Sequence, residues 1–149
     1  MTTYFSCHEY LPRQIKIPPQ KDVNIIIVIP CCCERNLLTA LGSLCNCIEP
    51  DCSAEVIVVI NAASGSSEGI LKQNLLTYKH ASAWIIKNKK RGIKYFLIAK
   101  NDLPERKAGV GLARKIGMDE AARRFCDINK KNGIIVCYDS DCTCDPNLL

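Results

Sequence analysis

Val23–Ile29 reads Val-Asn-Ile-Ile-Ile-Val-Ile, a run that is apolar except at Asn24 and mostly β-branched. A run of this kind is typical of a strand that is buried on both faces, as in a parallel sheet between two layers of helices. Three further runs share this character, namely Glu55–Ile60 (EVIVVI), Tyr95–Ala99 and Gly133–Tyr138. The sequence therefore predicts four buried strands.

Between these strands, apolar residues recur at intervals of three and four, which predicts helices. The expected helices cover Glu34–Cys45, Ser67–Lys79 and Lys107–Asp127. In the middle helix, four residues are expected to face the core: Ile70, Leu71, Leu75 and Tyr78. Trp84 follows this helix and falls in a link that the pattern assigns to no element.

The alternation of strands and helices predicts an α/β fold with a Rossmann-like, mostly parallel sheet and helices on both faces. The expected strand order is 3-2-1-4, with right-handed connections. Residues 1–22 contain Pro12, Pro18 and Pro19 and are expected to form an irregular arm. Residues 23–149 are expected to form one domain.

Composition argues against several classes of protein. Wholly apolar stretches such as Ile25–Ile29 are far shorter than the roughly 20 residues that cross a bilayer, and the N-terminus has no secretory signal. The net charge of +5 favours anionic ligands, but aromatic residues make up only 6%, so we expect no nucleic-acid partner. The basic residues, Arg123 and Arg124 among them, are expected on solvated faces. We expect a cytoplasmic protein with no transmembrane segment, or one held peripherally at the inner membrane face.

The chain has eleven cysteines, which we interpret as reduced thiols of a cytosolic protein. Cys137, in the fourth strand, is expected to be buried as a small apolar residue. The spacings Cys45-x-Cys47 and Cys142-x-Cys144 lack the two-residue gap of structural zinc sites. The triplet Cys31–Cys33 has no histidine nearby to activate a nucleophile, which argues against cysteine catalysis.

Asp139-Ser140-Asp141 directly follows the fourth strand. In a doubly wound sheet, ligands bind beyond the carboxyl ends of the strands where the strand order reverses. With the order 3-2-1-4, this place lies between Pro30–Arg35 and Tyr138–Asp145, with Asn61–Ser66 beside them. Two carboxylates there suit a magnesium or manganese ion that holds a diphosphate. The alternative is an ordinary solvated turn, because Asp and Ser are common turn residues.

Gly109-Val110-Gly111 at the start of the last helix resembles half of a dinucleotide-binding motif, but it follows the wrong strand and lacks the third glycine. It is also explained as a flexible start to the helix. Arg114, one turn further on, is placed to meet a phosphate at the helix N-terminus. Glu34 either caps the first helix or faces a nucleotide.

Four segments together resemble the family 2 glycosyltransferases, which are inverting enzymes with a GT-A, nucleotide-diphospho-sugar transferase fold. They are Ile26–Glu34 (IIVIPCCCE), Glu55–Ser66 (EVIVVINAASGS), Ala108–Ala122 (AGVGLARKIGMDEAA) and Asp139–Leu149 (DSDCTCDPNLL). They occur in the order in which the family has them. The chain departs from the family pattern at Cys31–Cys33, where Val-Tyr-Asn is usual, and at Ile60-Asn61, where two aspartates are usual.

The resemblance implies a role for seven residues. Pro30 and Cys31 would pack against the nucleotide of the donor, Glu34 would lie near its base or ribose, Asn61 beneath the base, Arg114 near the phosphates, Asp139 near the ribose and the metal, and Asp141 on the metal. The implied cofactor is manganese or magnesium. The implied reaction is transfer of a sugar from a nucleotide-diphospho-sugar to the hydroxyl of a carbohydrate or lipid-linked acceptor.

In this family the general base and most of the acceptor site come from the second half of the enzyme. We therefore expect a sheet that is incomplete at its C-terminal side, a chain that supplies only the donor and metal site and is inactive alone, and self-association through the open edge.

Two alternatives stay open. A sugar-nucleotide nucleotidyltransferase would need a glycine-rich loop after the first strand, and Pro30–Arg35 has no glycine. A non-catalytic nucleotide-sugar-binding module would use the same site.

Overall fold

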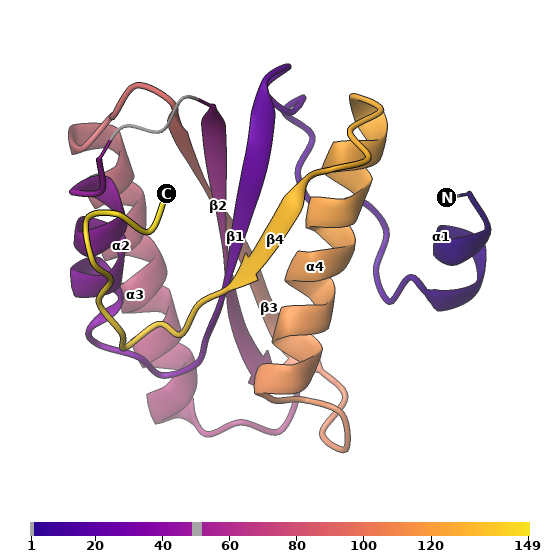
Figure 1. Cartoon of the computed structure of the whole chain (residues 1–149). Helices are drawn as coiled ribbons and strands as arrows, with labels where there is room; N and C mark the ends of the chain where they lie inside the picture. Colours follow the sequence, from indigo (N-terminus) through magenta and orange to yellow (C-terminus); the bar gives the residue numbers. More distant parts are fainter. Residues whose placement is uncertain (1, 49–51) are drawn as a thin grey trace.

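The computed structural model describes residues 2–48 and 52–149. Its centre is a four-stranded, all-parallel sheet in the order β3-β2-β1-β4 (Figure 1). The strands are β1 (Val23–Cys31), β2 (Ser53–Ala63), β3 (Ile93–Leu103) and β4 (Ile134–Cys137). The predicted strand order and parallel direction are confirmed.

Helices cover both faces of this sheet (Figure 1). The covering helices are α2 (Leu37–Cys45), α3 (Glu68–Lys87) and α4 (Val110–Asp127), and α1 (Thr2–His8) lies beyond α4. α2 and α3 lie on one face, and α4 lies on the other (Figure 1). The α/β class is therefore confirmed. No helix of the described ranges is long and apolar enough to cross a membrane.

Burial on both faces explains why the first strand is almost continuously apolar. Ile26 and Val28 pack in one cluster with Ile116 of α4, whereas Ile27 packs in a second cluster with Leu41 of α2. Successive side chains of a strand point to opposite faces, so both faces of β1 must be apolar when both are covered. Burying each of these side chains stabilises the fold by about 1.5–3 kcal/mol.

A close approach of α4 to the sheet depends on Gly117. A Cβ atom at this position would lie 2.3 Å from Cγ1 of Val28 and 3.2 Å from Cγ2 of Val59. Any side chain here would push the helix away from β1 and β2. Gly117 therefore fixes the depth at which α4 sits, and α4 begins beside the site described below.

The N-terminal arm is more ordered than its prolines predict. It begins with α1, and backbone or hydroxyl groups of the arm donate to two buried carboxylates on α4. Tyr4 Oη lies 2.8 Å from Asp119 Oδ1, Tyr10 N lies 3.1 Å from Asp119 Oδ2, and Ile15 N lies 3.2 Å from Glu120 Oε1. The prediction of an irregular segment is thus wrong for α1. The arm is held by hydrogen bonds to carboxylates of α4, and the sequence of the arm alone does not show these acceptors.

Arg124 is buried, so the prediction of a solvated face is wrong at this residue. Its guanidinium and the carboxylate of Glu55 on β2 are both fully buried, and Arg124 Nη2 lies 2.8 Å from Glu55 Oε1. Arg124 Nη1 also donates to the carbonyl of Ile17, and the guanidinium lies 4.4 Å from the ring centroid of Phe96. Each charge is compensated by its partner, which is the condition for burial of an ion pair.

Helix α3 runs further than predicted and turns a different face to the sheet. It extends to Lys87, so Trp84 lies in its last two turns. Its buried residues are Asn74, Thr77 and Ala81, whereas Leu75 and Tyr78 are 52% and 37% exposed. The apolar periodicity pointed to the wrong face because α3 contacts the strand ends through hydrogen bonds, as shown below.

The fourth strand is a half-exposed edge, not a buried strand. Among the described residues β4 pairs with β1 alone, Ile134 is 57% exposed and Cys137 is exposed. Ile135 and Val136 are partly buried against the two core clusters. The sequence composition of β4 resembles that of a central strand, but the strand order places it at the edge of the sheet.

Candidate functional site

A pocket of about 350 Å³ lies at the carboxyl ends of β1, β2 and β4 and beside the first turn of α4. All seven residues that the sequence predicts for the site line it: Pro30, Cys31, Glu34, Asn61, Arg114, Asp139 and Asp141. Cys32, Val110 and Ser140 complete the lining. The strand order reverses between β1 and β4, so the pocket lies where ligands bind in doubly wound sheets.

The loop after β1 forms one wall of the pocket, and Asn74 of α3 holds it in place. Cys33 has a left-handed backbone with φ of 54°, and its N–H donates to Asn74 Oδ1 at 2.8 Å. Asn74 Nδ2 donates to the carbonyl of Asn61 and to Oδ1 of Asn101, each at 2.9 Å. One buried amide thus joins the ends of β1, β2 and β3. The sequence analysis missed this residue; a polar side chain among the positions of α3 that face the sheet is the signal that identifies it.

Cys31 lies at the base of the pocket as a neutral thiol. It is 1% exposed, and this burial, together with the carboxylate of Glu34, raises the pKa of its thiol to about 12. Burial also raises the pKa of Cys32 above its ordinary value. A nucleophilic cysteine needs a lowered pKa, so the surroundings of this thiol are the opposite of an activated one.

Asn61 is oriented by a hydrogen bond to the neighbouring strand. It is 1% exposed, and its Nδ2 donates to the carbonyl of Cys31 at 3.1 Å. With Nδ2 turned to β1, Oδ1 is the atom that remains to accept a hydrogen bond. An amide in this position can accept from the N–H of a ligand without the charge that a carboxylate would add.

Glu34 lines the pocket and also organises the start of α2. Its Oε1 accepts from the N–H of Asn36 at 2.7 Å, and its carbonyl accepts from Thr77 Oγ1 of α3 at 2.7 Å. Helix α2 begins at Leu37, three residues later than predicted, because the backbone of residues 33–36 first forms the turn that these hydrogen bonds hold. The two interpretations of Glu34 are therefore compatible, since one oxygen binds the turn and the side chain still borders the pocket.

Arg114 and Asp139 form an ion pair with each other across the pocket. Their side chains are 37% and 53% exposed. Exposed ion pairs typically contribute only about 0–1 kcal/mol, so a ligand can replace either partner at little cost. Arg114 Nε is buried and has no hydrogen-bond partner in the described part of the chain. This atom is a donor that an anion in the pocket would satisfy.

Asp141 is exposed, and the turn after β4 brings it to the same pocket as Asp139, with Cys142 N donating to the carbonyl of Asp139 at 3.2 Å. Within residues 2–48 and 52–149, no group of three or more His, Cys, Asp or Glu side chains is arranged to hold a metal ion. Magnesium in proteins is often held by one or two carboxylates together with substrate phosphates and waters. Asp139 and Asp141 would fit that pattern if a diphosphate supplied the remaining ligands.

The cysteines considered for zinc are only partly brought together. Cys47 Sγ lies 3.6 Å from Cys144 Sγ, and the N–H of Ile48 donates to the carbonyl of Pro146 at 2.7 Å. These contacts attach the C-terminal segment to the end of α2, as the yellow coil beside α2 shows (Figure 1). All eleven cysteines are free thiols.

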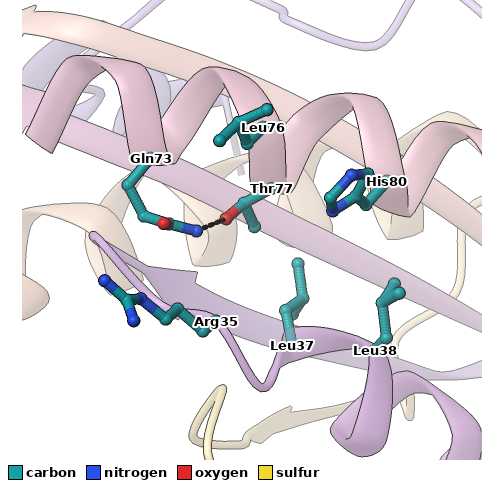
Figure 2. Close-up of a pocket in the computed structure, with 7 residues that line it drawn as sticks. All are labelled: Arg35, Leu37, Leu38, Gln73, Leu76, Thr77 and His80. Atoms are coloured by element: carbon teal, nitrogen blue, oxygen red, sulfur yellow. Dashed lines mark hydrogen bonds between the residues drawn. The ribbon is translucent and has the colours of Figure 1, made fainter. Parts of the chain in front are cut away.

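A second pocket of about 260 Å³ lies between the start of α2 and α3, outside the predicted site (Figure 2). Arg35, Leu37 and Leu38 line it from one side, and residues of α3, including Gln73 and His80, line it from the other. Gln73 Nε2 donates to Thr77 Oγ1 at 3.1 Å, the bond dashed in Figure 2. Thr77 also binds the carbonyl of Glu34, so the two pockets share a wall.

Comparisons of this chain with protein-family models, with curated proteins and with solved structures found no match.

Proposed function

We propose that the pocket at the carboxyl edge of the sheet binds a nucleotide-diphospho-sugar together with a divalent metal ion, and that the chain is the donor-binding part of an inverting glycosyltransferase of the GT-A type. One observation carries this proposal: seven residues from four segments of the sequence line a single pocket at the reversal of the strand order. The resemblance to family 2 glycosyltransferases rests on the sequence segments alone.

Each lining residue has a chemical task in this proposal. Asn61 Oδ1 accepts from the base, and Glu34 borders the nucleoside. Arg114 and the free N–H groups of the first turn of α4 hold the diphosphate, because a helix N-terminus attracts anions. Asp139 and Asp141 would hold manganese or magnesium, which neutralises charge on the departing nucleoside diphosphate. The free thiols agree with a cytoplasmic setting.

Calorimetric titration with UDP-glucose and GDP-mannose, each with and without manganese, tests the proposal. We expect binding that requires manganese and that weakens at least tenfold in Asp141→Asn. Asp102→Asn is the matched control, because Asp102 is an exposed acid near the end of β3 that lies outside the pocket. Equal affinities in Asp141→Asn and the wild type would refute the metal role. Absence of binding for both donors would refute the donor role.

Donor hydrolysis distinguishes the remaining alternatives. A glycosyltransferase in a longer protein should release nucleoside diphosphate slowly even without acceptor, whereas a binding module should not. A nucleotidyltransferase should instead form pyrophosphate from a nucleoside triphosphate and a sugar phosphate. Each product is separated by anion-exchange chromatography.

Self-association through β4 is also part of the proposal. The strand has no partner on its outer edge in the described residues, and Ile134, its first residue, is 57% exposed. Open apolar edges pair with other chains. Sedimentation velocity should show a concentration-dependent dimer, and Ile134→Lys should shift the protein to monomer; a wild type that stays monomeric at high concentration contradicts this.

A further inference from the structure

The positive charge of the chain is concentrated in one stretch. Residues 69–101 contain eight lysines and arginines and no aspartate or glutamate. The whole chain has 20 basic and 15 acidic residues, so removing these eight leaves 12 basic against 15 acidic residues. The net charge of +5 therefore comes entirely from this stretch, and the remainder of the protein is acidic.

Three lysines of this stretch occur around the end of α3 and the start of β3. Lys87 ends α3, Lys89 lies in the turn that follows, and Lys94 is on β3. All three are exposed, and none of them forms an ion pair or a side-chain hydrogen bond with a described residue. Lysines on an edge strand are common because they prevent pairing with other sheets. That explanation accounts for Lys94 but not for Lys87 and Lys89, which are not on the strand.

An apolar groove is lined by two of these lysines, Lys89 and Lys94, whereas Lys87 lines a different pocket beside Leu38. The groove has a volume of about 420 Å³ and separates the last turn of α3 from β3, and its apolar lining includes Ile17, Ile85, Ile86 and Phe96. Ile86 is 70% exposed, the highest value among the large apolar side chains of the described residues, and Ile17 is 60% exposed. Edge protection by lysine does not call for exposed isoleucines, so the groove requires a separate explanation.

We propose that this groove docks the protein onto a membrane surface that contains anionic lipids. Ile86 and Ile17 enter the boundary between headgroups and acyl chains, and Lys89 and Lys94 contact the headgroups. A basic rim around exposed aliphatic residues is the combination that holds peripheral proteins on anionic bilayers. A nucleic acid would need aromatic side chains for stacking, and the exposed side chains here are aliphatic.

The docking surface and the donor pocket lie at different ends of the sheet. The groove is formed where α3 ends and β3 begins, and the pocket is formed where the strands end (Figure 1). A protein docked through the groove keeps its pocket open to water. The inference therefore does not depend on the proposed function.

Trp84 provides a local readout, because it is the only tryptophan of the chain and its ring lies 5.5 Å from that of Tyr95, which lines the groove. The full chain is mixed with vesicles of phosphatidylcholine alone or with 30% phosphatidylglycerol at 0.1 M salt (about 10 Å screening length). We expect a blue shift of Trp84 fluorescence and co-sedimentation with the anionic vesicles only.

Two variants and one control separate the contributions. Lys89→Glu with Lys94→Glu should weaken binding by about 30-fold, since each basic residue near an anionic surface contributes about 1 kcal/mol, which is roughly a fivefold factor. Ile86→Ser should weaken it by about tenfold. Lys130→Glu with Lys131→Glu makes the same change of charge before β4, at the opposite edge of the sheet, and should keep the affinity within about threefold.

Circular dichroism checks that the variants are folded, which is expected because the substituted residues are exposed or half-exposed. Equal binding to neutral and anionic vesicles, or equal weakening by the control pair, would overturn the proposal. Binding to a single-stranded oligonucleotide but not to anionic vesicles at the same salt would also overturn it and would assign the groove to nucleic acid.

Discussion

Replacing Asn74 by leucine should loosen the carboxyl edge of the sheet. The amide of Asn74 is 1% exposed and makes three hydrogen bonds of 2.8–2.9 Å, to Cys33, Asn61 and Asn101. Leucine has nearly the same size but no polar atoms. The variant therefore removes the connection among three strand ends while it leaves little empty space in the core.

The expected loss is about 3 kcal/mol. The carbonyl of Asn61 is buried and loses a donor that water cannot replace, which costs about 1–3 kcal/mol. Cys33 and Asn101 are exposed, so water can take the place of the amide and the loss is about 0.5 kcal/mol for each. With a urea dependence of about 2 kcal/mol per molar, the unfolding midpoint should fall by roughly 1.5 M.

Urea unfolding followed by circular dichroism measures this loss, and Gln73→Leu is the matched control. Gln73 precedes Asn74 and makes one hydrogen bond within α3, to Thr77. Its replacement should cost less than about 0.5 kcal/mol. The reasoning is refuted if Asn74→Leu and Gln73→Leu shift the midpoint equally. Calorimetry on the folded fraction should also show weaker donor binding in Asn74→Leu, because the wall formed by Cys33 is no longer held.

Three further outcomes are expected. Gly109→Ala should destabilise the protein by about 1–3 kcal/mol in urea, because φ is 144° there, whereas Gly111→Ala, which meets open space, should be neutral or slightly stabilising. Arg13 holds the pKa of the Asp127 carboxyl below its ordinary value. Asp127→Asn should therefore remove about 0.5 kcal/mol of stability from this part-exposed pair at pH 7, and the loss should shrink as the pH falls below about 4. A loss that is independent of pH contradicts a contribution from the ion pair. Brief iodoacetamide treatment at pH 7.5 should leave Cys31 unmodified in peptide mass spectrometry while exposed cysteines react, because its pKa is about 12; native labelling of Cys31 would show that it is neither buried nor neutral.

The sheet and the pocket were predictable because both depend on patterns that are local in the sequence. Runs such as Val23–Ile29 and Glu55–Ile60 identify strands that are covered on both sides, and the general rule for parallel sheets then indicates where the pocket lies. Asp139 was predictable for the same reason, since it follows a strand directly. The edge position of β4 was not recognised in advance, because burial depends on the neighbours of a strand and not only on its own residues.

Polar residues that bind across the fold could not be predicted from local patterns. The sequence pattern predicts that Arg124 lies on the surface, and only the structure shows its buried ion pair with Glu55, 69 positions earlier in the chain. The sequence marks Asn74 only as a weak position in an amphipathic helix, and the structure shows its hydrogen bonds to Cys33, Asn61 and Asn101. Apolar periodicity therefore predicted the wrong face of α3, where the contact with the sheet is made by an amide and a hydroxyl.

The ion pair between Arg114 and Asp139 has a consequence for binding at the proposed donor site. A metal ion that arrives alone meets an aspartate already neutralised by the guanidinium, and a diphosphate that arrives alone meets a guanidinium already neutralised by the aspartate, next to the second carboxylate of Asp141. If both bound, Arg114 would contact the phosphates and Asp139 would hold the metal, so each ligand would release the side chain that the other needs. Because the exposed pair itself is worth at most about 1 kcal/mol, the exchange costs little and the two ligands should bind with positive coupling.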